Sequence, residues 1–183
     1  MTLANRITLL RLLLIPVFII CVMSYTREEP VFRFVAIGVF ITAALSDGLD
    51  GFIARAYNQK TRLGAVLDPL ADKLLINLAF VFLAVNHEFR TPVPAWFPVV
   101  ILSRDVIIVL GSYLINEYFG PLRVKPRFSG KLTTVLQLSS IGGVLLEVWF
   151  AHPLLLATLV ISIVSFVDYM YAGIKQVGNE DAS

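Results

Sequence analysis

The hydrophobic residues of this chain form long continuous runs instead of alternating with polar residues. Such runs are typical of membrane-spanning helices, and the missing period-two alternation argues against strands. Each run is long enough to cross a bilayer, for which ~20 residues suffice. Short polar, charged or proline-containing stretches separate the runs. The sequence therefore predicts six transmembrane helices, over residues 7–24, 31–55, 64–86, 93–118, 129–150 and 153–175.

The composition agrees with an all-α integral membrane protein. Of 183 residues, 57% are hydrophobic and only 15% are charged, whereas about a quarter are charged in soluble domains. The net charge of +2 is too small to indicate nucleic-acid binding, and the single cysteine, Cys21, excludes a disulfide framework. We expect one six-helix catalytic domain over residues 1–176 and a polar tail over 177–183.

The distribution of positive charge predicts the orientation in the membrane. Lysine and arginine gather in the N-terminal flank, the second and fourth connections and the tail: Arg6, Arg11, Arg55, Lys60, Arg62, Arg123, Lys125, Arg127, Lys131 and Lys175. Short loops rich in these residues stay in the cytoplasm. We therefore expect both termini on the cytoplasmic side of a bacterial inner membrane.

Four aspartates stand out at the ends of the second and third apolar runs. Asp47 and Asp50 are spaced i,i+3, and Asp68 and Asp72 are spaced i,i+4. Both spacings place the two carboxylates of a pair on one helix face. Acids next to a membrane are costly unless they have partners, and divalent cations are natural partners. A helical hairpin that uses the acids for caps and salt bridges is the alternative.

Four carboxylates converging from two helices can hold two hard ions, Mg²⁺ or Mn²⁺. Two such ions offset the repulsion between the carboxylates. They also stabilise the attacking and leaving oxygens of a phosphoryl displacement. The orientation predicted above places this candidate active site at the cytoplasmic face, where a water-soluble leaving group can depart.

The stretch resembles the signature of the CDP-alcohol phosphatidyltransferases. All fixed positions of that signature are present: Asp47, Asp50, Gly51, Ala54, Arg55, Gly64, Asp68 and Asp72. The resemblance implies a six-helix membrane bundle that transfers a phosphatidyl group from CDP-diacylglycerol to an alcohol and releases CMP. It implies that the four aspartates bind the metals and that Asp72 also helps to deprotonate the acceptor hydroxyl. Family members often form homodimers, so a homodimer is a further expectation.

The residues beside the first pair are expected to contact the nucleotide. Gly51 and Ala54 are small and allow close approach to the helix backbone. The resemblance assigns Gly51 and Ala54 to cytidine and pyrophosphate, and places Arg55 near the phosphates. Close packing between membrane helices is the alternative for the small residues.

A second polar group predicts an acceptor site. Arg104 and Asp105 interrupt the fourth apolar run, so they should face the bundle interior. Lys131 opens the fifth run, with Thr134 and Gln137 following at i+3 and i+6. Arg104 and Lys131 are predicted to bind an anionic acceptor. The nearby basic connection, with Arg123, Lys125 and Arg127, either joins this pocket or anchors on anionic lipids.

The acceptor itself has two readings. Asn5, Thr8 and Arg11, with the chain length, resemble members that use glycerol 3-phosphate and form phosphatidylglycerophosphate. Other runs look more like members that use phosphatidylglycerol and form cardiolipin: Thr91-Pro-Val-Pro, Ser103-Arg-Asp-Val and Val124-Lys-Pro-Arg-Phe. Glycerol 3-phosphate is the first expectation. A small cation transporter is a rival from another class, but its acids would lie near the bilayer midplane.

Overall fold

The computed structural model describes residues 3–56, 62–118 and 128–180, and side chains within 9–46, 73–118 and 128–175. Within these ranges the chain is all-helical and has the six helices that the hydrophobic pattern predicts. They are α1 (Leu3–Ser24), α2 (Val31–Ala56), α3 (Arg62–Val85), α4 (Trp96–Tyr118), α5 (Phe128–Leu145) and α6 (Ala151–Glu180). The last helix extends past the expected tail boundary at residue 177.

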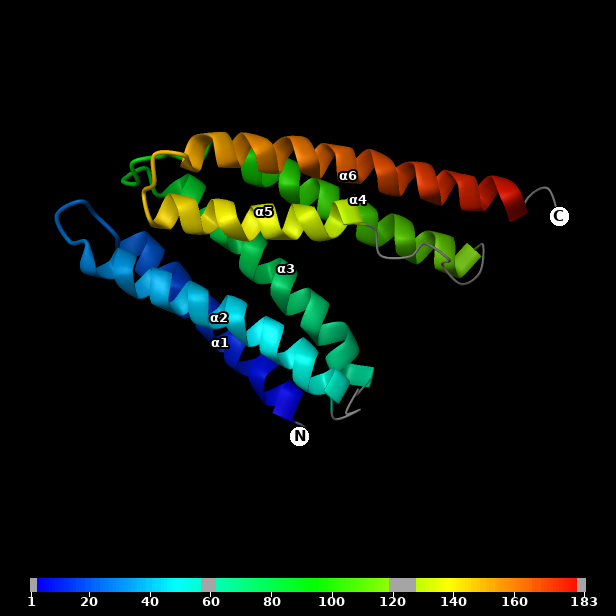
Figure 1. Ribbon diagram of the computed structural model, residues 1–183, viewed down its shortest axis with the longest axis horizontal. Coiled ribbons are helices and arrows are strands. Elements are labelled where there is room, and N and C mark those ends of the chain that lie inside the picture. The colour runs from blue at the N-terminus through cyan, green and yellow to red at the C-terminus, as the bar shows by residue number, and fades with distance from the viewer. Residues whose placement is uncertain (1–2, 57–61, 119–127, 181–183) are drawn as a thin grey trace.

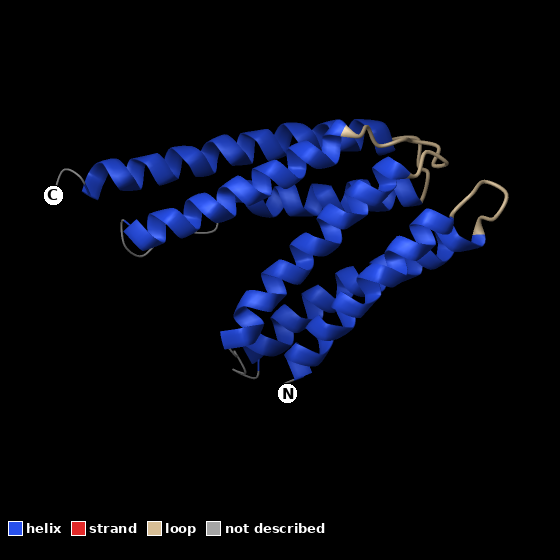
Figure 2. Cartoon of the chain, turned by 180° about the vertical axis from the view of Figure 1, so that it is seen from behind, coloured by secondary structure: helices blue, strands red, loops and turns tan. Residues whose placement is uncertain are grey.

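The helices form two groups of three. In the first group α1 packs along α2 and α3, and in the second α6 packs along α5 and α4. Helix α3 also contacts α4 and α5 and so joins the groups. Figure 1 shows the connections α1–α2, α3–α4 and α5–α6 gathered at one end, from which the two groups diverge toward the termini. Figure 2 shows the same divergence from behind.

Aromatic and aliphatic side chains from all six helices form the core near the end where the connections gather. Phe18, Phe40, Phe80, Phe97 and Ile141 are almost completely buried. The rings of Phe18 and Phe40 lie 5.9 Å apart, and those of Phe80 and Phe97 lie 5.1 Å apart. Such offset aromatic pairs favour fixed packing. This core holds the two groups together at one end.

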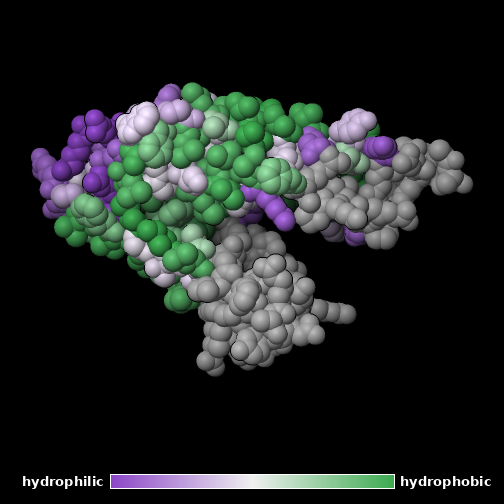
Figure 3. All heavy atoms as spheres, viewed as in Figure 1, coloured by the Kyte–Doolittle hydropathy of each residue, from purple (hydrophilic) through white to green (hydrophobic). Residues whose placement is uncertain are grey.

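Large hydrophobic side chains also cover the outside of the molecule. Leu13, Val109 and Val160 are each more than half exposed. Figure 3 shows hydrophobic residues covering the helical face, with hydrophilic residues gathered at the end that carries the three connections. An apolar surface of this extent on the drawn face fits contact with lipid rather than water.

Two helices of the described residues are long and apolar enough to cross a membrane, Trp96–Tyr118 and Ala151–Lys175. Shorter apolar segments occupy Leu9–Ser24, Val31–Ser46 and Lys73–Val85. The six predicted spans and the cytoplasmic termini stay predictions.

Helix α5 ends at Leu145, five residues earlier than the hydrophobic run predicts. The Glu147 amide donates to Val144 O at 3.0 Å, and the Val148 amide donates to Gly143 O at 3.1 Å. This pair of bonds is a Schellman cap, which requires a left-handed residue after the helix. Glu147 takes that role with a φ of 53°. The hydrophobic pattern does not predict this helix end, because the end depends on the backbone geometry of the cap.

Candidate active site

The aspartate motif lies where α2 ends and α3 begins. Asp47 and Asp50 belong to the last turns of α2, and Asp68 and Asp72 belong to the first turns of α3. The predicted metal and nucleotide residues lie outside the described side chains: Asp47, Asp50, Gly51, Ala54, Arg55, Asp68 and Asp72. Among the side chains that are described, no group of three His, Cys, Asp or Glu residues is placed to hold a metal.

Next to the motif, α2 and α3 both pack against α1. Ile15 of α1 forms a small buried cluster with Ala43 of α2 and Leu75 of α3. Ala43 precedes Asp47 by one turn, and Leu75 follows Asp72 by three residues. Residues three or four apart share a helix face. The described packing therefore holds α2 and α3 together on α1 next to the motif.

A buried arginine occupies the same region of α1. Arg11 precedes Ile15 by one turn, and only 1% of it is exposed. Ser46, the residue before the motif, is also buried, and its hydroxyl donates to Thr42 O at 2.6 Å. A buried guanidinium requires anionic or hydrogen-bonding neighbours. Arg11 thus adds positive charge beside the motif end of the bundle. The side chains of Asn5 and Thr8 lie outside the described set.

Arg104 and Asp105 face the bundle interior, as the sequence predicts. They are 9% and 6% exposed, respectively. Arg104 Nη1 donates to Asp105 Oδ1 at 2.6 Å, and Nη2 donates to the hydroxyl of Ser165 on α6 at 2.8 Å. These two bonds fix the guanidinium between α4 and α6.

Asp105 also binds a residue that the sequence analysis missed. Lys73 Nζ lies 2.9 Å from Asp105 Oδ2, and Asn77 Nδ2 lies 3.5 Å from the same oxygen. Two cations therefore share one carboxylate, which leaves a net positive charge at this point. The sequence does contain a signal for both residues. Lys73 directly follows Asp72, and Asn77 is one turn later in an otherwise apolar part of the helix, where a polar side chain needs a partner.

Lys131, the other predicted acceptor residue, has a different environment. Its side chain is exposed in the first turn of α5, and it makes no hydrogen bond or ion pair with a described residue. Of its predicted companions, Thr134 is half-buried and Gln137 is fully buried. The described contacts do not join Lys131 to Arg104. Residues 123–127 of the basic connection lie outside the described part of the chain.

The start of α5 is held closely against α6. The Ser129 hydroxyl donates to Asp168 Oδ2 at 3.0 Å. A Cβ atom at Gly130 would lie 3.1 Å from the hydroxyl of Tyr169, so the missing side chain allows this close approach. These contacts hold the Lys131 backbone in a fixed position, although its side chain is exposed.

Several buried polar atoms in the described interior have no hydrogen-bond partner there. Among them, those on α3, α4 and α5 are Asn77 Oδ1, Arg104 Nε and both side-chain polar atoms of Gln137. Buried polar atoms are nearly always paired in folded proteins, so each exception requires an explanation. Together they give α3, α4 and α5 spare hydrogen-bonding capacity, as a site for a polar ligand requires.

The sequence pattern of the family described as CDP-alcohol phosphatidyltransferase matches residues 1–167. A Mycobacterium tuberculosis protein named "Probable phosphatidylglycerophosphate synthase" is 33% identical over 184 residues, covering 96% of this chain and 83% of the relative. The Aquifex aeolicus CDP-diacylglycerol–glycerol-3-phosphate 3-phosphatidyltransferase is 33% identical over 191 residues, covering 98% and 100%. The human cardiolipin synthase (CMP-forming) is 37% identical over 153 residues, covering 75% and 48%.

Proposed function

The chain belongs to the CDP-alcohol phosphatidyltransferase family, and on this premise we propose that it uses CDP-diacylglycerol and glycerol 3-phosphate. The products are phosphatidylglycerophosphate and CMP. Relatives whose names carry this activity align over nearly the whole chain. Family membership also favours a membrane enzyme over the cation transporter considered from the sequence.

One observation supports the proposal most directly. The buried cluster of Ile15, Ala43 and Leu75 lies within a turn of Asp47 and Asp72, and α1 carries both helices that bear the motif. The buried Arg11 lies one turn beyond Ile15 on the motif side. The proposed pyrophosphate site would combine the four acids with this nearby positive charge.

The chemistry of the donor set fits hard divalent cations. Asp47, Asp50, Asp68 and Asp72 would hold two ions, Mg²⁺ or Mn²⁺, because carboxylate oxygens suit these ions. When bound, the ions supply charge stabilisation for the pyrophosphate. Lys73 is directed to Asp105 at 2.9 Å and so is engaged away from the aspartate set.

In the proposed reaction the acceptor hydroxyl oxygen attacks the phosphorus that carries diacylglycerol. The new phosphorus–oxygen bond forms as the bond to the CMP oxygen breaks, so CMP leaves with the bonding electrons. Asp72 takes the proton of the acceptor hydroxyl, a general-base role. Gly51 and Ala54 allow the nucleotide to approach the α2 backbone, and Arg55 contacts its phosphates.

The acceptor phosphate is proposed to bind between α4 and α5. Arg104 is held rigidly by Asp105 and Ser165 and keeps its buried Nε free of described partners. Lys131 supplies a second, solvent-reaching cation from a fixed backbone. Lys73 shares the Asp105 carboxylate with Arg104, so the two cations together keep a net positive charge there. A rigidly held guanidinium such as that of Arg104 suits phosphate recognition.

Phosphatidylglycerol is the alternative acceptor, with cardiolipin as the product. The observation that favours it is the 37% identity to human cardiolipin synthase, although that match covers less of both chains. In either case we propose that the active site faces the cytoplasm, where CMP is released.

Supplying radiolabelled glycerol 3-phosphate and CDP-diacylglycerol to purified enzyme tests the choice. Labelled phosphatidylglycerophosphate is expected. No labelled lipid, together with cardiolipin formation from phosphatidylglycerol, would reverse the order of the two candidates. Absence of CMP release with every alcohol tested would overturn the proposed reaction class.

A further inference from the structure

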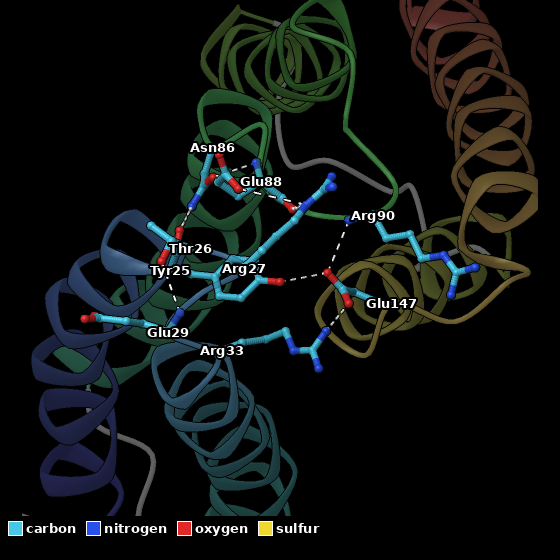
Figure 4. A network of polar contacts seen from close by, with 9 residues as sticks. All are labelled: Tyr25, Thr26, Arg27, Glu29, Arg33, Asn86, Glu88, Arg90 and Glu147. Carbon is cyan, nitrogen blue, oxygen red and sulfur yellow. Dashed lines mark hydrogen bonds and ion pairs between the residues drawn. The ribbon is translucent and has the colours of Figure 1, made fainter.

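A polar cavity of about 390 Å³ lies at the end of the bundle opposite to the aspartate motif. It opens where the connections α1–α2, α3–α4 and α5–α6 meet, and Figure 4 shows most of its polar residues. The lining residues are Tyr25, Arg27, Pro30, Arg33, Arg90 and Glu147. The lining therefore holds three arginines and one carboxylate. With a rise of about 1.5 Å per residue, Arg33 lies roughly 20 Å from Asp47 along α2, so this cavity is separate from the candidate active site.

Glu147 organises the cavity from an unusual backbone position. It is the left-handed residue of the α5 cap, where glycine is the usual choice. Its carboxylate accepts hydrogen bonds from the Tyr25 hydroxyl at 2.9 Å, from the Arg90 amide at 3.2 Å and from Arg33. Burial acts to raise the pKa of Glu147, but these bonds and the Arg33 charge outweigh it and lower the pKa. The carboxylate stays ionised and holds three segments in fixed positions.

Buried hydrogen bonds also fix Tyr25 and the end of α1 beside the cavity. Asn86 is buried, and its side-chain amide donates to Val22 O at 2.6 Å. It also donates to Tyr25 O at 3.0 Å (Figure 4). These bonds cap α1 and tie it to the end of α3. Tyr25 is almost fully buried, and its ring lies 5.8 Å from the Arg33 guanidinium carbon. Arg33 is thus restrained from both sides.

The arginines keep donor capacity beyond these contacts. Arg33 Nε is buried and has no partner among the described residues. Arg90 bonds to Glu147 only through its backbone amide, and Figure 4 shows its side chain extending away from Arg27 and Tyr25. Arg27 Nε donates to Glu88 O at 3.0 Å and lies 3.9 Å from the Glu88 carboxylate in a largely exposed pair, which is a weak interaction and leaves both Nη groups as donors. Guanidinium groups present paired donors that match phosphate oxygens.

Aromatic residues place this end of the bundle at a membrane surface. Trp149, two residues after Glu147, is 88% exposed, and Trp96 at the start of α4 is 52% exposed. Tryptophan collects at the level of lipid headgroups. The cavity therefore opens at the depth where lipid phosphates lie.

We propose that this cavity binds a phosphate group at the membrane face opposite to the aspartate motif, with Arg27, Arg33 and Arg90 as donors. The phosphate belongs either to the headgroup of an anionic phospholipid or to free inorganic phosphate. Its binding links the three connections at this end, and so stabilises the junction of the two helix groups.

The test uses full-length protein purified in detergent. In the first arm, phosphatidylglycerol or phosphatidylcholine is added and retained lipid is counted by native mass spectrometry. In the second arm, inorganic phosphate is titrated and the unfolding temperature is measured. The variant Arg27→Gln/Arg90→Gln removes two side-chain donors without breaking the bonds to Glu147. Lys175→Gln, which removes an exposed charge on α6, is the matched control.

One charge-assisted contact contributes roughly tenfold or more in affinity, so the double variant should bind at least tenfold more weakly than the control. If the double variant retains one phosphatidylglycerol molecule fewer than Lys175→Gln, while phosphatidylcholine is unchanged, the phosphate comes from the lipid. A loss confined to the inorganic phosphate arm supports the free anion. Equal retention of both by the double variant and Lys175→Gln overturns the site. CMP release, measured on the same samples, reports the proposed function separately.

Discussion

The Lys73 ammonium lies 2.9 Å from the Asp105 carboxylate and connects α3 to α4 one residue beyond the last aspartate of the motif. Asp105 is buried and also accepts from Arg104 at 2.6 Å. One carboxylate thus sets the spacing of two cations from different helix groups. Any ligand that spans the motif and α4 would meet both.

Asp105→Asn should weaken acceptor binding as well as stability, because both cations lose their counter-charge. We expect the KM for glycerol 3-phosphate to rise about tenfold and the unfolding free energy to fall by about 1–3 kcal/mol. Ser103→Ala is the matched control, since its exposed hydroxyl bonds only to Val100 O at 3.1 Å. A variant that matches this control in both measurements would contradict the role of Asp105.

Asp47→Asn or Asp68→Asn should remove most of the turnover and leave the protein folded. The reason is the proposed loss of a metal ligand, since an amide oxygen carries no charge to offset a divalent ion. CMP release and size-exclusion chromatography in detergent measure the two properties. Full activity of the wild-type enzyme in excess chelator would refute metal dependence.

Asp72→Asn should lower kcat more than it weakens CDP-diacylglycerol binding. General-base catalysis typically contributes ~10²–10⁴-fold, and the amide cannot accept the proton. Turnover and donor binding are measured on the same preparation. Equal losses in the two would assign Asp72 to metal and substrate binding alone.

Arg104→Ala and Lys131→Ala should each raise the KM for glycerol 3-phosphate, with little change for CDP-diacylglycerol. A charge-assisted hydrogen bond is worth about 1.5–3 kcal/mol, which corresponds to roughly tenfold to a hundredfold. Arg104→Lys should not rescue binding, because lysine lacks the two-pronged guanidinium. A rise confined to the CDP-diacylglycerol KM would move these residues to the donor site.

The Glu147 contacts predict a dependence of stability on pH. The pKa of Glu147 lies below its ordinary value of 4.5, since the contacts outweigh burial. A carboxylate of this kind stabilises the fold above its unfolded pKa and loses that contribution as the pH falls through the folded pKa. Wild-type stability should therefore decline below about pH 4.5.

Glu147→Gln should cost about 1–3 kcal/mol near pH 7 and flatten this decline. Unfolding in detergent as a function of pH measures both effects. Glu28→Gln, an exposed carboxylate on the α1–α2 connection, is the control. Identical acid slopes for the two variants would exclude Glu147 as the titrating group.

The sequence predicts much of this architecture because hydrophobic run length and charge distribution are local properties. It places Arg104 and Asp105 inside the bundle, since a charged pair within an apolar run has no other low-energy location. It misses Lys73 as the partner of Asp105 and Ser165 as the partner of Arg104, because these residues meet only through packing of distant helices. Burial of Gln137 beside an exposed Lys131 likewise depends on how α5 is rotated, which apolar content alone does not fix.

The division into two groups of three helices has a consequence for selectivity. Under the proposed assignment, the residues for the nucleotide lie on α2 and α3, while Arg104 and Lys131 lie on α4 and α5. Recognition of the two substrates is thus encoded in consecutive halves of the polypeptide. The segment after residue 95 can be exchanged with that of a relative of different acceptor preference. The resulting chimaera should still release CMP but form a different lipid product.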